Sequence, residues 1–146
     1  MKIKYILLSL VAILSFSLVS CNDDDDDLKN LPQAVTEAFA AKYPTSTVRS
    51  WELEMGYYVA DFTHDGREAE AWFKADGTWV ETDTDYRSDE LPNPVTDYIA
   101  ANYAGYYVDD ADLIQTPTEE FFRIELDKNG AADVIIKIKA DGTLLK

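Results

Sequence analysis

Apolar residues recur at helical spacing in two stretches of the chain that start sixty residues apart and closely resemble each other. The first stretch, Leu31 to Tyr43, reads LPQAVTEAFAAKY, and the second, Leu91 to Tyr103, reads LPNPVTDYIAANY. This spacing predicts an amphipathic helix in each stretch. A proline near a helix start is tolerated because the N–H groups of the first turn have no intrahelical partner. Helices of about three turns are not stable alone, so each must pack on another element.

Alternating apolar and polar residues follow each helix and predict antiparallel strands. The pairs Asp65-Gly66 and Asn129-Gly130 favour tight hairpin turns, and Ala-Asp-Gly-Thr closes both halves at residues 75–78 and 140–143. One face of the predicted sheet is apolar in both halves. In the first half it carries Tyr58, Ala60, Phe62, Ala69, Ala71 and Phe73, matched in the second by Phe122, Ile124, Leu126, Val134, Ile136 and Ile138.

The predicted fold class is therefore α+β, a tandem repeat of a helix followed by an antiparallel β-meander, with the helices on one face of the sheet. The repeats span residues 31–81 and 91–146. Val48 to Met55 predicts one more strand, whose counterpart Val108 to Gln115 is interrupted by aspartates. Thr82 to Glu90 is expected to be a polar, acidic connector.

Residues 1–20 combine two lysines with a short apolar run and indicate a cleaved signal peptide. The junction Leu18-Val19-Ser20-Cys21 resembles the lipobox of bacterial lipoproteins, which implies that Cys21, the sole cysteine, carries lipid. The domain would then be tethered to the membrane only through this anchor. With no second cysteine the domain has no disulfide to rely on, so its core must hold it together.

Five aspartates, Asp23 to Asp27, follow within a predicted tether of residues 21–30. Such a run is a solvated spacer by composition. It also resembles the signal that sends lipoproteins of the Bacteroidetes to the cell surface. The expected location is thus an outer-membrane lipid anchor, either surface-exposed or facing the periplasm.

The formal net charge is −15, and removal of Lys2 and Lys4 with the signal peptide would make it −17. A chain this acidic repels phosphate backbones, so nucleic acid and anionic lipid are poor partners. A cation or a basic protein surface suits it better.

The paired Leu-Pro-x-x-Val helices, the aromatic strands and the Asp-Gly turns resemble the PepSY-like family of Bacteroidetes envelope proteins over residues 28–146. The fold of that family is likened to the β-lactamase inhibitor protein. The resemblance implies an exported helix-plus-sheet domain with a binding or inhibitory role and no catalytic motif.

Catalytic chemistry is missing from the sequence, which predicts that the protein is not an enzyme and needs no cofactor. His64, the single histidine, lies in a predicted turn, and Cys21 is assigned to lipid. No carboxylate stands in an apolar run of the kind that would raise its pKa. Acidic clusters leave calcium as a minor alternative, without the loop pattern of a calcium site.

Aromatic residues on the sheet face away from the helices are the candidate binding residues. The alternation points Tyr57, Trp72 and Phe121 outward, and Trp79 joins them without a definite face. Such aromatics can simply cover one another, but as a group they form a candidate contact patch. The leading expectation is an unidentified envelope or extracellular protein as partner. The alternative is a capture or sensing module for calcium or a glycan.

Overall fold

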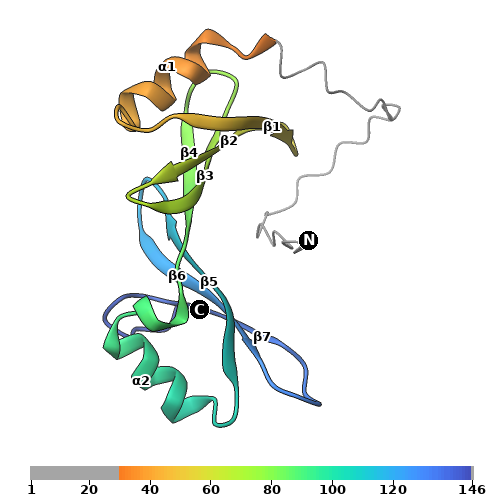
Figure 1. The fold of residues 1–146 in the computed structure, drawn as a ribbon, viewed down its shortest axis with the longest axis vertical. Helices are drawn as coiled ribbons and strands as arrows, with labels where there is room; N and C mark the ends of the chain where they lie inside the picture. Colours follow the sequence, from red (N-terminus) through yellow and green to blue (C-terminus); the bar gives the residue numbers. More distant parts are fainter. Residues whose placement is uncertain (1–29, 146) are drawn as a thin grey trace.

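The computed structural model describes residues 30–145 and contains one antiparallel sheet with two α-helices (Figure 1). The predicted signal peptide, the lipidation site Cys21 and the aspartate run lie outside the described residues. The elements follow in the order α1 (Gln33–Lys42), β1 (Val48–Glu54), β2 (Tyr57–His64), β3 (Arg67–Phe73), β4 (Trp79–Asp85), the 3₁₀ turn η2 (Ser88–Glu90), α2 (Asn93–Asn102), β5 (Tyr107–Gln115), β6 (Glu120–Asp127) and β7 (Val134–Ile138). Within residues 30–145, no helix is long and apolar enough to cross a membrane.

The seven strands lie in the sheet in their order along the chain, so every neighbouring pair is antiparallel. Pairing of β4 with β5 joins the two halves, with Thr82 opposite Gln115 and Asp85 opposite Asp112. The prediction of a connector from Thr82 to Glu90 is therefore wrong for its first half. Backbone groups at 82–85 pair with a strand that is distant in sequence, and this pairing outweighs their polar composition.

The two helices cover the same face of the sheet at its opposite ends (Figure 1). Each begins after a proline, Pro32 or Pro92, whose carbonyl accepts the first helical hydrogen bond. Each ends at a tyrosine, where the N–H of Tyr43 or Tyr103 donates to the residue four positions earlier at 2.8 Å. The ends predicted from the sequence hold because Pro44 disfavours helical geometry in the residue before it and Gly105 adopts a positive φ of 83°.

A separate apolar core lies under each helix. The core under α1 consists of Val35, Phe39, Tyr43, Ala60, Phe62, Ala69, Ala71 and Phe73. The core under α2 consists of Leu91, Val95, Ile99, Ala111, Phe122, Ile124, Leu126, Ile136 and Ile138. The apolar face derived from the alternation is thus correct in both halves. Small alanines in the first core are compensated by aromatic rings, such as those of Phe39 and Phe62, whose centroids lie 5.0 Å apart.

The two closing Asp-Gly turns make matching contacts with the two helices. Asp76 accepts a hydrogen bond from the N–H of Thr78, and Asp141 accepts one from Thr143, both at 2.9 Å. A Cβ added to Gly77 would lie 2.5 Å from the carbonyl oxygen of Ala34 in α1. Each turn therefore sits close against the first turn of a helix, where a larger residue does not fit.

The other two predicted turns differ in length. Asp65 and Gly66 both have positive φ, at 49° and 81°, and close a two-residue hairpin as predicted. Asn129-Gly130 does not, because the β6–β7 pairing starts at Leu126 opposite Val134 and leaves a longer loop.

Candidate binding surface

The face of the sheet opposite the helices is termed the open face, because in residues 30–145 no helix packs on it. Successive side chains of a strand point to opposite faces of the sheet, and paired residues share a face. The pairing register therefore shows which residues lie on the open face. The apolar and aromatic residues of the open face include Tyr57, Val59, Trp72, Tyr107, Ile114, Phe121 and Ile135. They lie in separate groups, because β4 places Glu81 and Asp83 between Trp72 and Ile114, and Ile135 lies opposite Glu125.

Two of the predicted contact aromatics are on the open face but are buried, so the expectation that they are exposed is wrong. Trp72 is 1% exposed and Phe121 is 8% exposed. Trp72 pairs with Val59 and meets the ring of Tyr57 edge-on, with centroids 6.2 Å apart. Phe121 lies opposite Ile114 and beneath the Lys137 ammonium, 5.5 Å from the ring centroid. Neighbouring side chains cover these rings, which a single-strand pattern does not show.

The other two predicted aromatics are half-buried and lie on different faces. Tyr57 is on the open face, at the end of β2. Trp79 lies on the helix face, because a bulge in the β3–β4 pairing sets it opposite Phe73. The Lys42 ammonium of α1 is 3.5 Å from the Trp79 ring centroid, and the Trp79 indole N–H donates to Thr82 at 2.9 Å. Trp79 therefore packs beside α1 on the helix face and is not part of the open face.

An ion cluster at the junction of the two halves was missed by the sequence reasoning. Arg123 on β6 donates through Nη2 to Asp112 Oδ2 at 2.7 Å and to Asp83 Oδ2 at 3.2 Å. Asp83 and Asp112 are 7% and 4% exposed. Asp83 stood within the predicted connector, and only the pairing of β4 with β5 brings it beside Asp112 and Arg123, which is forty positions away. The sequence feature that could have indicated this cluster is the position of Arg123 between the apolar residues Phe122 and Ile124.

Burial is the main influence on the two carboxylates of this cluster. It raises the pKa of Asp83 to about 7, with Arg123 opposing the rise and Glu81, Asp112 and Glu70 adding to it. Burial likewise raises the pKa of Asp112, again opposed by Arg123. The expectation that no carboxylate has a raised pKa is therefore wrong, because the apolar surroundings come from other strands rather than from the local sequence.

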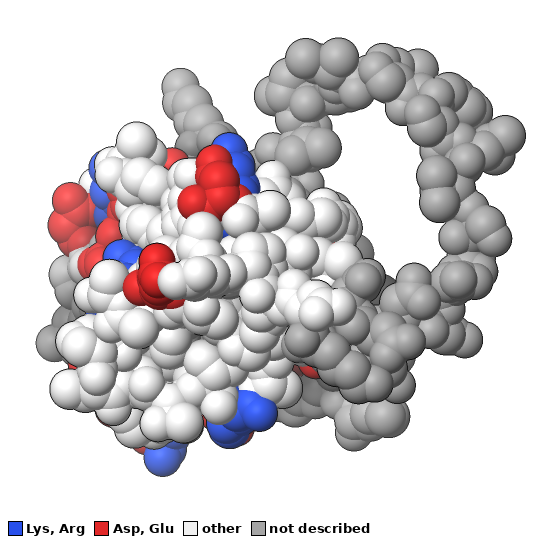
Figure 2. Space-filling view, turned by 90° about the horizontal axis from the view of Figure 1, so that it is seen from above, with Lys and Arg blue, Asp and Glu red and all other residues white. Residues whose placement is uncertain are grey.

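Carboxylates lie around and between these apolar residues and outnumber the cations of the same face. The register places these acidic residues there: Glu52, Glu54, Asp61, Glu68, Glu70, Glu81, Asp83, Asp85, Asp110, Asp112 and Glu125. The cations are Arg49, Arg123 and Lys137, and Arg49 is paired with Asp61 at 2.5 Å. The α1 end of the molecule shows only scattered charges of both signs (Figure 2). On the open face, by contrast, carboxylates clearly outnumber cations.

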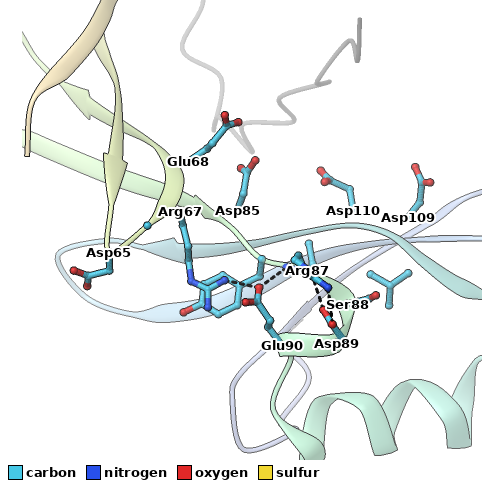
Figure 3. Close-up of a pocket in the computed structure, with 14 residues that line it drawn as sticks. Asp65, Arg67, Glu68, Asp85, Arg87, Ser88, Asp89, Glu90, Asp109 and Asp110 are labelled. Carbon is cyan, nitrogen blue, oxygen red and sulfur yellow. Dashed lines mark hydrogen bonds and ion pairs between the residues drawn. The ribbon is translucent and has the colours of Figure 1, made fainter.

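A wide polar cleft of about 880 Å³ lies between the β2–β3 turn, the β4–α2 connection and β5 (Figure 3). Both arginines that line this cleft form ion pairs. Arg67 pairs with Glu90 at 2.5 Å and stacks on Tyr86 at 4.1 Å, while Arg87 pairs with Asp89. In Figure 3 the carboxylates of Glu68, Asp85, Asp109 and Asp110 point away from these pairs. The few apolar walls make this cleft unlike a typical small-molecule pocket.

Metal and histidine chemistry find little support in the described part of the chain. No group of three or more acidic, histidine or cysteine side chains in residues 30–145 is arranged to hold a metal ion. His64 ends β2 rather than lying in the turn, and its ring packs 5.1 Å from that of Tyr43. His64 therefore packs at the border of the core under α1.

These observations define an α+β protein in which two helices back a seven-stranded antiparallel sheet with an acidic open face. Residues 56–146 match a family described as "Putative beta-lactamase-inhibitor-like, PepSY-like". The chain belongs to this PepSY-like family. No match was found among curated proteins.

Solved structures from Bacteroides species share the fold. A BLIP-like protein from Bacteroides fragilis is 35% identical, with a TM-score of 0.73, covering 84% of this chain and 89% of that one. A protein from Bacteroides eggerthii, described among "putative periplasmic proteins", is 30% identical with a TM-score of 0.71, covering 80% and 87%. A DUF2874 family protein from Bacteroides uniformis is 29% identical with a TM-score of 0.71, covering 79% and 86%. None of these descriptions names a reaction.

Proposed function

We propose that this protein is a non-catalytic binding module of the cell envelope, and that its open face binds a protein partner. The observation that carries the proposal is the open face itself, where apolar side chains lie among a larger number of carboxylates. Protein interfaces commonly combine a desolvated apolar centre with a polar rim. Membership of a β-lactamase-inhibitor-like family supports a binding role over a catalytic one.

The charge of the open face selects the kind of partner. Acidic residues predominate there, so a basic surface would be attracted and an acidic one repelled. Inhibition would follow where the bound surface includes the active site of an enzyme. This inhibitory role is the more specific part of the proposal and rests on the family likeness.

Two further parts of the proposal concern the whole chain. We infer that lipid on Cys21 holds the domain at the outer membrane, on the surface or periplasmic side. We also infer that the two halves descend from one duplicated unit. The matched helix ends and Asp-Gly turns support the duplication.

A glycan or calcium partner is less well supported. Stacking on sugar rings needs an accessible aromatic face, and Trp72 is only 1% exposed. Calcium takes six to eight oxygen ligands, and the acidic groups in residues 30–145 are not arranged as a metal site.

Photo-crosslinking from the open face tests the proposal. A photoreactive residue at Ile135, which is 47% exposed, should crosslink a specific envelope protein in living cells. The matched control carries the same residue at Ala100, on the exposed side of α2. The purified partner should then bind the purified chain, with an affinity that falls as salt increases. Equal crosslinking from both positions, or none from Ile135, would contradict the use of the open face.

A further inference from the structure

The outer edge of β1 has no strand beside it among the described residues, because the sheet begins with this strand. The β1–β2 hairpin closes with the two-residue turn Met55-Gly56, and Glu54 lies opposite Tyr57. Residues that flank such a turn exchange both main-chain hydrogen bonds, and the pattern alternates along the ladder. Trp51 and Leu53 therefore direct their N–H and C=O groups away from the sheet, where another strand can bind them.

The two edges of the sheet differ in how they are protected. Natural edge strands are commonly blocked by lysine, proline or a bulge. On β7 the outer edge is already engaged at one point, since the N–H of Leu145 donates to the carbonyl of Lys137 at 2.8 Å. On β1 the bulge lies before Ser50, and residues 50–54 contain neither lysine nor proline. The outer edge of residues 50–54 is therefore suited to strand addition.

The side chains of this edge present a different chemistry to each face. Leu53 is 43% exposed on the helix face, and Met55 in the turn is 65% exposed. On the open face Glu52 and Glu54 lie two positions apart, and burial, followed by the charge of Glu52, raises the pKa of Glu54. Arg49, the one cation of β1, is already paired with other carboxylates. The edge is thus apolar toward the helix face and acidic toward the open face.

We propose that an extended segment of a protein partner adds to β1 as an antiparallel strand, with apolar side chains on the helix face and lysine or arginine opposite Glu52 and Glu54. The inference rests on the proposed function and names the chemistry of its partner. Directly paired residues of adjacent strands share a face, so the segment alternates between apolar and basic residues. Antiparallel pairing is the more stable arrangement and continues the pattern of the sheet.

A second copy of β1 is a poor occupant of this edge. Pairing Trp51 of one copy with Leu53 of the other sets the two Glu52 carboxylates opposite each other, and like charges in that position are destabilising. The net charge of −15 adds a general repulsion between copies. A basic partner segment meets neither obstacle.

An NMR titration of the isotope-labelled full chain with a seven-residue peptide of alternating valine and lysine tests the inference. The main-chain amide signals of Trp51 and Leu53 should shift saturably. A peptide with glutamate in place of lysine is the charge control and should leave both signals unchanged. Equal shifts with the two peptides, or none at Trp51 and Leu53, would overturn the inference.

Two N-methylated forms of the lysine peptide separate strand addition from simple charge attraction. In the antiparallel arrangement the valines lie opposite Trp51 and Leu53, so their N–H groups face β1 and those of the lysines point away. Methylation of the valine nitrogens should therefore abolish binding, whereas methylation of the lysine nitrogens should preserve it. Equal binding by both methylated peptides would show that the main chain of β1 is not used.

Variants of the protein provide an independent readout. Leu53→Pro removes an outward N–H, which an edge strand tolerates, and should abolish peptide binding. Ile135→Pro is the matched control, because Ile135 lies two positions from Lys137 and also directs its N–H outward, from the opposite edge. The double variant Glu52→Gln with Glu54→Gln keeps the backbone and should bind the lysine peptide about tenfold more weakly, through the loss of two exposed charge pairs.

Failure of this inference is distinguishable from failure of the proposed function. A partner that crosslinks to Ile135 equally well in Leu53→Pro and wild type would keep the proposed function and overturn strand addition at β1. Loss of that crosslink in Leu53→Pro, with the crosslink retained in the double glutamine variant at reduced yield, is the result expected for an added strand.

Discussion

The hydroxyl groups of Tyr43 and Thr82 lie 2.5 Å apart beneath α1. Tyr43 ends the helix, and Thr82, which is fully buried, lies in the strand that joins the two halves of the sheet. Thr82 also accepts the indole N–H of Trp79, so its hydroxyl contacts both the end of α1 and the first residue of its own strand. The position of the first helix is therefore coupled to the junction of the sheet.

Loss of this contact should weaken the fold by a modest amount. Tyr43→Phe removes one buried hydrogen bond and keeps the ring, so we expect a loss of about 0.5 to 1.5 kcal/mol in the free energy of unfolding. Urea denaturation measures it. Tyr103→Phe is the control, because Tyr103 ends α2 and is only half-buried. A larger loss in the control than in Tyr43→Phe would contradict this view.

Truncation in the second core should cost more. Ile136 is 4% exposed under α2, and Ile136→Ala should lower the free energy of unfolding by about 2 to 5 kcal/mol. Its neighbour Ile135 points to the open face and is half-exposed, so Ile135→Ala should change stability by less than about 1 kcal/mol. Thermal denaturation of both variants provides the comparison. An unchanged melting temperature for Ile136→Ala would refute the face assignment.

The close approach of the first Asp-Gly turn to α1 predicts a site-specific intolerance. Gly77 has a φ of 83°, and a Cβ there would meet the carbonyl oxygen of Ala34 at 2.5 Å. Gly130 has a similar φ of 79° but nothing within 4 Å. Gly130→Ala should therefore show only the backbone cost of about 1 to 2 kcal/mol, and Gly77→Ala a clearly larger loss of stability. Equal melting temperatures would show that α1 moves aside without cost.

Asp83 should make stability decrease between about pH 4 and pH 7. Its pKa is about 7 in the folded state against an ordinary value of 3.8, so the folded state holds the proton more tightly in this interval. The stabilisation is complete below the ordinary pKa and is lost as the pH rises through 7. Asp83→Asn cannot titrate and should be more stable than wild type at pH 8, by about 1 to 3 kcal/mol, and nearly equal to it at pH 4.

Denaturation of both proteins at pH 4, 6 and 8 measures this difference. The exposed Asp97→Asn serves as the control for the loss of one acidic charge. A constant difference between Asp83→Asn and wild type across the pH series would show that Asp83 titrates alike in the folded and unfolded states.

Local patterns were sufficient for the helices and most strands. Helical spacing and prolines set the limits of α1 and α2, and alternation identified the apolar face that both helices cover. These features depend on residues that are close in sequence, and their physical causes act within a few positions. The Asp65-Gly66 turn is of the same kind, because its conformation is decided by two residues.

The binding surface depended on contacts between distant residues. The sequence placed Trp72 and Phe121 on the correct face but left them exposed, because the neighbours that cover them come from other strands. The sequence placed Asp83 in a polar, acidic connector, whereas the β4–β5 pairing buries it beside Arg123. Burial, and with it the raised pKa of Asp83, is a property of the assembled sheet. The sequence by itself thus determined the elements and their apolar faces, while the tertiary structure decided which polar groups lose contact with water, since that depends on strand neighbours far away in the chain.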